Sequence, residues 1–422
     1  MRGPAQTVPD RAGPALSMIK ILLGLGLFGL LTSSIFSGLV VAAVWKFVRR
    51  RRQGDEQTSL PAASSFRPPV SLFKPLHGAE PDLEKHLASF FEQDYPEYEI
   101  VFGARVASDA GLDAARRVAA RYPRIPVKYV LTGEPWQINA KVCTLELMEA
   151  AAAHDIFIIS DSDVRVTPNY IREVVAPFAD EKTGAVTCLY RGVAEDGLWA
   201  KLEAAGMSAE MTAGVLVADM MEGMQFTLGP TMAARRSCMR EIGGFNMLGP
   251  YCADDFVLGN AIAAKGHTVV LSTHVIDHLV LNSDFVDSQK HQIRWMKSTR
   301  FSRPKGHFGT SLTFSVPFGL LACFAALLLH HPVLGLSLLT YSIAARVALA
   351  LVVGGAVVRE RHLIRTALLY PLRDLLGFFY WAASYGSREI VWRHQIYLLT
   401  AGGLMLPRDS ANREGDQPIV TA

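Results

Sequence analysis

The stretch DIFIISDSDVRV, residues 155–166, places two aspartates one residue apart directly after an apolar run. The run at 156–160 has the composition of a buried strand, and Asp161 and Asp163 follow it. Two carboxylates this close repel each other unless a positive group lies between them. Magnesium or manganese would supply that charge, because such an ion takes one or two carboxylates together with substrate phosphates. The pattern predicts a divalent metal that carries a nucleotide diphosphate; the alternative is a pair of turn aspartates that cap a helix near Thr167.

Other acidic residues stand where they could join this site. Asp109 precedes one helical stretch, and Asp254 and Asp255 precede another at 256–265. One member of the second pair is predicted to be a general base that removes the proton from an attacking hydroxyl. The alternative is an acidic pair that the helix dipole favours in the first turn.

A basic and aromatic segment, HQIRWMKSTRFSRPKGHFG, occupies residues 291–309. Arg294 is predicted to hold a diphosphate, because a guanidinium matches phosphate oxygens in a bidentate arrangement. Trp295 is predicted to pack under the second substrate. The alternative is a juxtamembrane segment that anionic lipids attract.

The chain between residues 70 and 285 alternates short β-rich runs with helical stretches, which indicates a mostly parallel α/β sheet. A helix after the paired aspartates is expected to have Thr167 as its N-cap and Pro168 in its first turn. Ligands of such sheets lie beyond the carboxyl ends of the strands, where Asp161 and Asp163 fall. No Walker P-loop and no GxGxxG after the first strand occur. Strands are expected at 70–73, 99–102, 127–131 and 156–160, and helices at 81–93, 110–121 and 139–153.

Composition separates a soluble middle from apolar ends. The 422 residues are 50% hydrophobic, and the excess is concentrated towards both termini, as in membrane proteins. A net charge of +3 gives no nucleic-acid footprint. The five cysteines show neither CxxC pairs nor zinc spacing, so reduced, partly buried thiols are expected.

The first apolar segment predicts a membrane anchor at residues 18–46, after an N-terminal tail at 1–17. Residues 21–44 carry no charge and are long enough to span a bilayer. Lys46 and the arginines at 49–52 follow, and this basic cluster places the next domain in the cytoplasm. A basic, Pro/Ser-rich linker is expected at 47–69.

A second apolar block predicts two further spans at 310–358, giving three in all. Arg346 interrupts the second of them, and a charge at that depth is expected either to hold helices together or to contact substrate. Residues 359–400 are expected to form interfacial or re-entrant helices. A cytoplasmic tail is expected at 401–422.

Taken together, these residues resemble the membrane-bound family 2-type glycosyltransferases, and within them the ceramide glucosyltransferases (family 21). The order of motifs is an early Asp109, the D-x-D at 161–163, a later Asp255, and HQIRW where the family has (Q/R)xxRW. VSLFKPLHG, SFFEQDYPEYEIVFG, INAKVCTLE and FTLGPTMAARRSCMREIGGF are further matches. The stretches GPTMAARR and RWMKSTRFSRPKGH are most similar to the bacterial hopanoid biosynthesis-associated glycosyltransferases.

The resemblance implies a GT-A fold for residues 70–285, with an interfacial RW segment at 286–309. It implies an inverting transfer of a hexose or N-acetylhexosamine from a UDP-sugar with Mg or Mn as cofactor. The resemblance implies that Asp109 and Asp161 bind uridine, that Lys141 lies near the diphosphate, and that Asp163 ligates the metal. It also implies that Asp255 is the general base and that Arg294 and Trp295 close the site.

Two positions depart from the family pattern. His291 occupies the first position of (Q/R)xxRW, so the usual contact of that residue is missing. Gln292 is not expected to replace it, because neighbouring residues of a helix point about 100° apart. Relatives often carry a second acidic residue just before Asp109, where this chain has ARVAS.

The acceptor is expected to be a membrane lipid alcohol, either a hopanoid polyol of the bacteriohopanetetrol type or ceramide, because the site is tethered to the bilayer. Six methionines form an adaptable apolar groove in this interpretation and ordinary core in the alternative. They are Met207, Met211, Met220, Met221, Met224 and Met232.

The expected location is the inner membrane of a bacterium, with several spans and a cytoplasmic catalytic domain. Two other functions remain open. A processive polysaccharide synthase needs more spans than this chain offers, and a non-catalytic scaffold that binds nucleotide-sugar has no need of a base. A glycosidase would not explain the diphosphate clamp.

Overall fold

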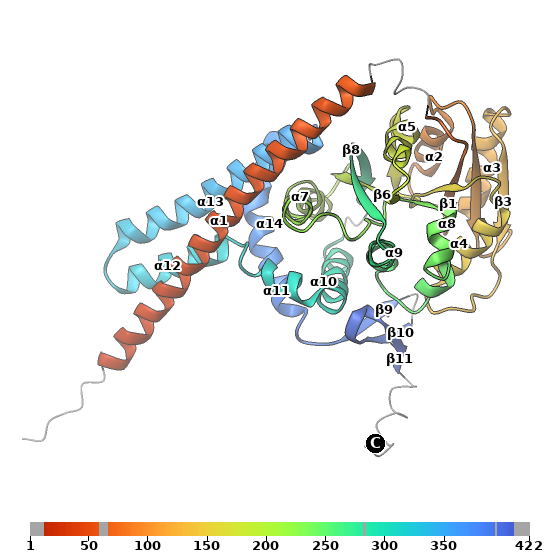
Figure 1. The fold of residues 1–422 in the computed structure, drawn as a ribbon. Coiled ribbons are helices and arrows are strands. Elements are labelled where there is room, and N and C mark those ends of the chain that lie inside the picture. The colour runs from red at the N-terminus through yellow and green to blue at the C-terminus, as the bar shows by residue number, and fades with distance from the viewer. Residues whose placement is uncertain (1–11, 59–65, 282–283, 393–394, 409–422) are drawn as a thin grey trace, which may run out of the picture.

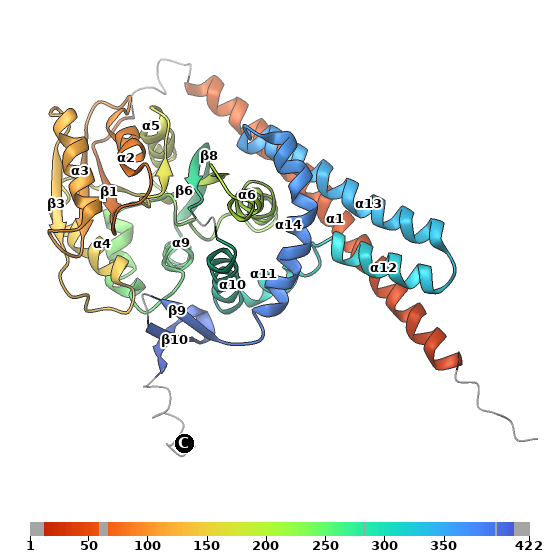
Figure 2. The same cartoon turned by 180° about the vertical axis from the view of Figure 1, so that it is seen from behind.

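The computed structural model describes residues 12–58, 66–281, 284–392 and 395–408. It contains an α/β body, with long helices packed along one side (Figures 1 and 2). Helix α1 (Ala12–Thr58) and the hairpin of α12 (Val316–Leu328) and α13 (Pro332–Val353) extend away from the body. Between the body and these helices lie α7 (Thr212–Met221), α10 (Phe285–Ser302), α11 (Pro304–Thr310) and α14 (Leu363–Ala383). The site lies where this intermediate layer meets the body.

The body is built on an eight-stranded sheet with the order β3-β2-β1-β4-β7-β6-β8-β5. Strands β3, β2, β1 and β4 are parallel, and β7 runs antiparallel between β4 and β6. The mostly parallel α/β sheet predicted from the sequence is therefore confirmed. The strands are β1 (Val70–Pro75), β2 (Tyr98–Ala104), β3 (Val127–Leu131), β4 (Ile156–Ile159), β5 (Val164–Arg165), β6 (Thr183–Val193), β7 (Met232–Arg235) and β8 (Thr268–Leu279).

Helices cover this sheet, and two of them, α3 and α4, begin at residues whose side chains cap them. Asp109 caps α3 by accepting hydrogen bonds from the backbone N–H groups of Gly111 and Leu112. One predicted start is wrong, because α5 begins at Tyr170, after Thr167 and Pro168. The helices around the sheet are α2 (Leu83–Phe91), α3 (Ala110–Arg121), α4 (Ala140–Ala151), α5 (Tyr170–Val175), α8 (Arg236–Glu241) and α9 (Asp254–Ala264), with 3₁₀ turns η2 (Ala176–Ala179) and η4 (Phe245–Leu248).

An intermediate layer connects the body to the long helices. A π-helix, η3, joins two α-helices of this layer without a break, and π-turns are often found at functional sites. The layer consists of α6 (Leu198–Ala205), η3 (Gly206–Met211), α7, α10, α11 and α14.

Helix α1 (Ala12–Thr58) corrects the predicted linker and tail boundaries. It runs through the segment expected to be a linker at 47–69 as far as Thr58, and residues 59–65 lie outside the described residues. The arginine run stays helical because it packs against other elements. Arg50 forms an ion pair with Asp219 of α7 (3.2 Å), and Arg51 donates to the Val357 carbonyl (2.7 Å).

Two segments among the described residues, Ala15–Gly54 and Pro332–Val358, are long and apolar enough to cross a membrane. They correspond to α1 and to α13 (Pro332–Val353) with its π-helical end η5 (Gly354–Val358). The helix at the expected third span, α12 (Val316–Leu328), has only 13 residues, so that span stays a prediction. At 1.5 Å per residue it covers about 20 Å, less than the ~30 Å of a bilayer core. Its start is fixed by Asp374 of α14, which accepts from the N–H groups of Ser315 and Val316.

The segment at 359–400 is helical only in its first half. A single helix, α14 (Leu363–Ala383), precedes a small antiparallel sheet of β9 (Glu389–Trp392), β10 (Gln395–Leu399) and β11 (Met405–Pro407), with the 3₁₀ turn η6 (Ala401–Gly403). This sheet packs its apolar side chains around Cys252 of the body, which explains why these residues are not helical. The segment 401–422 was expected to be a tail, but its first residues belong to this small sheet. Residues 409–422 lie outside the described residues.

Arg346 holds the long helices together. Its side chain is buried, donates to Ser37 Oγ of α1 (3.0 Å) and to the Thr313 carbonyl (3.2 Å), and lies 3.5 Å from Asp374. Arg346 does not line the cavity described below. Of the two roles expected for it, the structure therefore favours holding helices together over contacting substrate.

Replacing Arg346 by methionine is expected to destabilise the chain by about 3–5 kcal/mol, because Asp374 is left as an uncompensated buried charge. Chemical denaturation in detergent would measure the free energy of unfolding. Arg365→Met is the matched control, because Arg365 is exposed on α14. Equal stability of the two variants would contradict the role assigned to Arg346.

Candidate active site

The paired aspartates leave the end of β4 and meet two lysines. Asp161 forms an ion pair with Lys141 of α4 (2.6 Å), and Lys74 of β1 donates to the Asp161 backbone carbonyl. Burial opposes the charge on Lys141, but Asp161, Asp254 and Asp255 outweigh it and raise its pKa above the ordinary value. The site therefore holds a fixed cation at the position predicted for a diphosphate contact.

Lys74 lies beneath the aspartates and was not predicted as a site residue. Its ammonium group is completely buried and stands 3.8 Å from the centre of the Phe90 ring. Burial lowers its pKa to about 7, although Asp161 and Asp163 oppose the shift. Lys74 thus fixes the backbone at the strand exit from below.

Asp163 faces His278 of β8, which sequence reasoning also missed. Asp163 Oδ2 lies 3.6 Å from His278 Nε2, and the ring of Tyr190 packs against the histidine at 5.2 Å between centroids. Asp163 Oδ1 and His278 Nδ1 are buried atoms that make no hydrogen bond within the described residues. A carboxylate and an imidazole that face each other in this way suit a divalent cation that takes its remaining ligands from water and phosphate.

The described part of the chain shows no site at which three or more His, Cys, Asp or Glu side chains converge for a metal. The two donors match an ion that arrives with a phosphate-bearing substrate and keeps several waters.

Asp255 is held at the start of α9 opposite Asp161. Its carboxylate accepts hydrogen bonds from the N–H groups of Gly229 and Phe256, both at 2.8 Å. A Cβ atom on Gly229 would lie 3.3 Å from Asp255 Oδ2 and 3.5 Å from Asp161 Oδ2, so both carboxylates face one small space. Burial, and then the charge of Asp254, raise the pKa of Asp255 to about 6. Such a carboxyl is suited to taking up a proton near neutral pH.

Asp254 and Asp255 also occupy the first turn of α9, so the helix-dipole interpretation and the catalytic one are compatible. Asp254 Oδ2 lies 3.8 Å from Lys141 Nζ, which links this pair to the one at the strand exit.

Asp109 lies outside this group. Its carboxylate caps α3 and accepts hydrogen bonds from the N–H of Gly78 at 3.0 and 3.1 Å. It thereby fixes the loop after β1, and it does not line the cavity. The predicted contact with uridine stays a prediction.

Arg294 and Trp295 of α10 line the cavity, and burial lowers the pKa of Arg294. The His291 ring lies against Trp295 in a tilted contact (4.4 Å between centroids, 52° between the ring planes), and its Nδ1 lies 2.8 Å from the buried carboxylate of Glu203. The histidine at the unusual motif position therefore orients the tryptophan.

Gln292 corrects an expectation. It is buried and lines the cavity, whereas His291 does not, so the side chain next in sequence is the one that faces the site.

Other cations of the basic segment at 291–309 contact protein. Lys297 donates to the Glu389 carbonyl (2.8 Å) and Arg300 to the Ser384 carbonyl (2.7 Å). These two residues fasten α10 to the C-terminal segment, which is a role that neither of the sequence interpretations contained.

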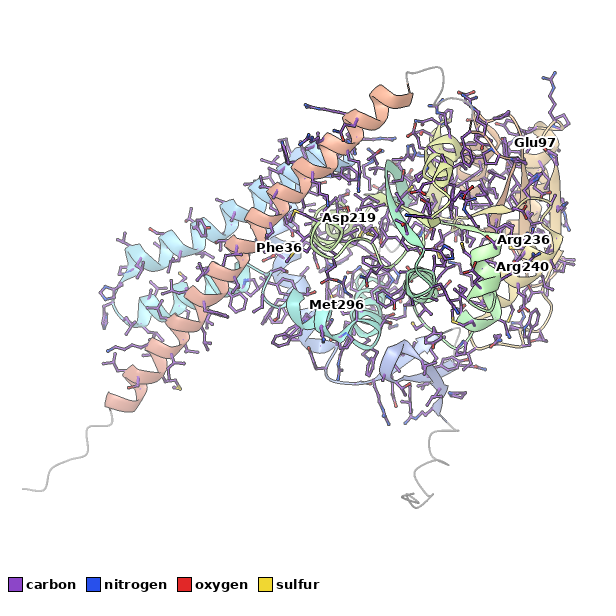
Figure 3. All side chains as sticks on the ribbon, viewed as in Figure 1. Phe36, Glu97, Asp219, Arg236, Arg240 and Met296 are labelled. Atoms are coloured by element: carbon purple, nitrogen blue, oxygen red, sulfur yellow. The ribbon has the colours of Figure 1, made fainter. Side chains whose placement is uncertain are left out.

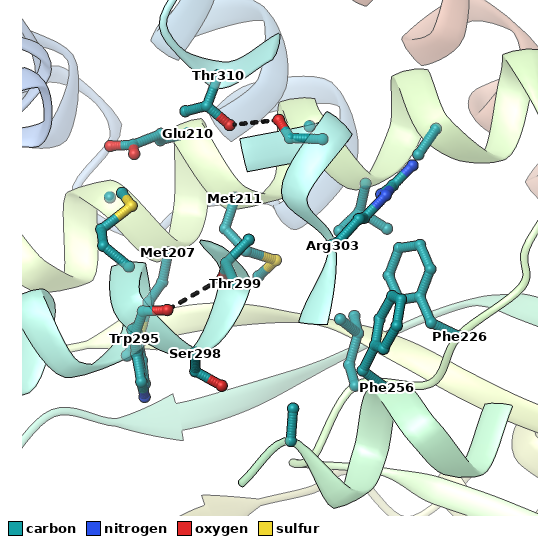
Figure 4. A pocket seen from close by; sticks show the side chains of 18 of the residues that line it. Met207, Glu210, Met211, Phe226, Phe256, Trp295, Ser298, Thr299, Arg303 and Thr310 are labelled. Atoms are coloured by element: carbon teal, nitrogen blue, oxygen red, sulfur yellow. Dashed lines mark hydrogen bonds between the residues drawn. The ribbon is translucent and has the colours of Figure 1, made fainter. Parts of the chain in front are cut away.

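A cavity of about 750 Å³ connects the aspartates to the long helices. Its polar end holds Lys141, Asp161 and Asp255, and its apolar wall includes Phe36 of α1 and Met296 of α10 (Figure 3). Figure 4 shows its middle, where Trp295 comes from α10 and Met207 and Met211 from η3. The cavity therefore reaches α1, a segment that could lie in a membrane, through the apolar side chain of Phe36.

The methionine groove is only partly confirmed. Met207, Met211 and Met221 line the cavity, whereas Met232 is a core residue of β7. Met220 and Met224 pack with the core as well.

Comparison with known proteins decides the family. The profile of Glycosyl transferase family 21 matches residues 30–405, which is most of the chain. The chain belongs to this family. The fold is accordingly that of a GT-A glycosyltransferase, and the ceramide glucosyltransferase-like resemblance is confirmed.

Individual relatives of this family 21 member are distant. It is 27% identical over 208 residues to ceramide glucosyltransferase 1 of Caenorhabditis elegans, covering 49% of this chain and 44% of that protein. The chain thus spans less than half the length of that relative. It is 23% identical to ceramide glucosyltransferase 3 of the same organism, covering 87% and 79%. A solved structure, the mannosyltransferase PcManGT from Pyrobaculum calidifontis in complex with GDP-Man and Mn2+, aligns with a TM-score of 0.46 and 18% identity, covering 84% of this chain and 99% of that one.

Proposed function

We propose that this chain transfers a hexose or N-acetylhexosamine from a UDP-sugar to the hydroxyl of a membrane lipid, with inversion at the anomeric carbon. The observation that carries the proposal is the single cavity that joins Asp161 and Asp255 to an apolar wall reaching α1. A diphosphate sugar fits the polar end, and a lipid fits the apolar one. The family supports the reaction class.

Each polar residue has a role in this reaction. Asp255 accepts the proton of the lipid hydroxyl as its oxygen bonds to the anomeric carbon and the bond to the UDP oxygen breaks. Lys141 and Arg294 neutralise the departing diphosphate. Trp295 packs against the lipid or the sugar at the border between the two.

Asp163 and His278 are the residues that would hold Mg²⁺ or Mn²⁺. The ion, when bound with the donor, stabilises the charge that develops on the leaving diphosphate. Asp161 forms an ion pair with Lys141, and in this proposal it binds the uridine of the donor together with Asp109 at the start of α3.

The acceptor is a lipid alcohol with a hydroxyl within reach of Asp255. A hopanoid polyol and ceramide are the two proposed acceptors, the first from the motif resemblance and the second from the curated relatives. Phe36 on the apolar wall belongs to a segment able to cross a bilayer, so the lipid can enter sideways without passing through water.

The proposed location is the cytoplasmic membrane of a bacterium. Helix α1 crosses once, and its arginines at 49–52 keep the body in the cytoplasm. The α12–α13 hairpin extends from the body beside α1 and turns back towards it (Figure 1). In this proposal the hairpin re-enters on the same side, and the catalytic domain stays at the cytoplasmic face.

The pH dependence follows from Asp255. Because its pKa is raised to about 6 and the base must be ionised, the rate is expected to rise with pH through 6 and to level off above 7. Asp254 and Lys141 face the same space and shift this pKa in opposite directions. A profile of kcat against pH measures it, and a flat profile between pH 5 and 7 would contradict the assignment.

UDP release by the purified full-length chain tests the function. The assay uses Mg²⁺ or Mn²⁺, a panel of UDP-sugars, and ceramide or a hopanoid polyol as acceptor. Release that requires an acceptor supports the transferase. UDP binding without release on any pair would support the nucleotide-sugar scaffold, and lipid-independent elongation of a sugar chain would support the polysaccharide synthase.

A further inference from the structure

The cavity contains a second charged group on elements other than those of the catalytic aspartates. Glu210 of η3 and Arg373 of α14 both line it, with Glu210 Oε2 3.2 Å from Arg373 Nε. The Arg373 side chain is 7% exposed and the Glu210 side chain 19%. Figure 4 shows Glu210 at the end of the cavity opposite Phe226 and Phe256. The proposed transfer reaction gives this pair no role.

Glycines make room for the pair on both sides. A Cβ atom on Gly206 would lie 2.2 Å from Arg373 Nε, and one on Gly377 would lie 3.3 Å from Glu210 Oε2. Gly206 is also the first residue of the π-helix that carries Glu210. The local sequence therefore admits the guanidinium and the carboxylate where larger residues would displace them.

The pair has unused hydrogen-bonding capacity. Glu210 Oε2 and Arg373 Nε are buried, and within the described residues neither makes a hydrogen bond despite their ion pair. The Tyr380 ring covers a face of the Arg373 guanidinium at 5.3 Å, and a ring face supplies no hydrogen-bond acceptor in the guanidinium plane. Leaving such atoms unsatisfied costs about 1–3 kcal/mol each. These two atoms are shielded from the open space, but both side chains line the cavity, so its wall carries a carboxylate and a guanidinium side by side.

We propose that Glu210 and Arg373 form a subsite for a second polar group of the acceptor lipid, one that both donates and accepts a hydrogen bond. A hydroxyl or a secondary amide can donate to the carboxylate and accept from the guanidinium, whereas an ester has no hydrogen to donate. The inference rests on the proposed lipid acceptor and narrows it to lipids that carry a hydroxyl or amide besides the reacting hydroxyl. Diacylglycerol, which has a single hydroxyl and two esters, is the class that this subsite rejects.

The experiment compares ceramide, bacteriohopanetetrol and diacylglycerol as acceptors for the full-length chain in detergent. The wild type is expected to prefer one of the first two over diacylglycerol by at least tenfold in kcat/KM, because buried polar groups reject a ligand that leaves them unpaired. In Glu210→Leu/Arg373→Met this preference should fall to within about threefold, with the KM for the UDP-sugar unchanged. Removing both charges together avoids an unpaired buried ion. Glu210→Gln is a second variant that retains the side-chain shape.

Thermal unfolding with the same lipids gives a readout that does not need turnover, because a bound lipid raises Tm. The control is Arg105→Met/Glu134→Leu, an exposed ion pair of similar chemistry. Loss of the preference only in the cavity variant, in kcat/KM or in the Tm shift, supports the subsite. If no acceptor turns over but the Tm preference is still lost, the transferase fails and the subsite stands. Equal responses of the wild type to the three lipids, or a preference that survives the double substitution, would overturn it.

Discussion

Replacing Asp255 by asparagine is expected to lower kcat by about 10³-fold, which is within the range that a positioned general base contributes. The affinity for UDP is expected to stay within about threefold, because the lost interaction acts on the acceptor in the transition state. Steady-state kinetics with a saturating lipid acceptor measures the first quantity, and calorimetric titration of UDP measures the second. Thermal unfolding of the variant checks that the hydrogen bonds from Gly229 and Phe256 still hold the loop.

Asp254→Asn is the matched control, since it alters the neighbouring carboxylate in the same turn. Asp254 lies 3.8 Å from Lys141 and is expected to affect donor binding more than the chemical step. A larger loss of kcat in Asp254→Asn than in Asp255→Asn would move the base to Asp254.

Replacing Asp163 by alanine is expected to abolish metal-dependent UDP binding and to lower kcat/KM by about 10³-fold, because an ion on a departing phosphate contributes several kcal/mol. His278→Ala is expected to weaken the metal response in the same direction and by less, since the carboxylate carries the charge. Titration of UDP with and without Mn²⁺ measures both effects. The His278 substitution should leave UDP binding in the absence of metal unchanged.

Metal-independent activity in the wild type, with Asp163→Ala active as well, would show that Lys141 and Arg294 alone hold the diphosphate. Asp161→Asn provides the comparison, because it breaks the ion pair with Lys141 and leaves Asp163 and His278 in place.

Local signals in the sequence were sufficient for part of the fold. Strand β3 and helix α3 have the predicted bounds, because a β-branched run and an aspartate N-cap specify them without help from distant residues. Asp161 and Asp163 were predicted as site residues from one strand exit, and in the structure Asp161 lines the cavity while Asp163 faces His278 beside it. Helix α12 was predicted too long, since its start depends on Asp374, roughly 60 residues later in the chain.

Residues from distant strands could not be predicted as parts of the site. His278 reaches Asp163 only because β8 and β5 pair, and Lys74 reaches Asp161 because β1 and β4 are neighbours. Glu210 and Arg373 lie on elements with no sequence motif between them. Gln292 could not be predicted for a different reason. The helix period gives the angle between neighbouring side chains, but it does not tell which of them faces the cavity.

The most direct measurement is mass spectrometry of the lipid fraction after incubation of the full-length chain with a UDP-sugar and a polyhydroxylated or amide-containing lipid alcohol. The account predicts a lipid that carries one added sugar, absent from the Asp255→Asn reaction, with an anomeric configuration opposite to that of the donor by NMR. Release of UDP without any glycosylated lipid, in the presence of every acceptor class offered, would contradict the central claim that this cavity brings a nucleotide sugar and a membrane lipid together.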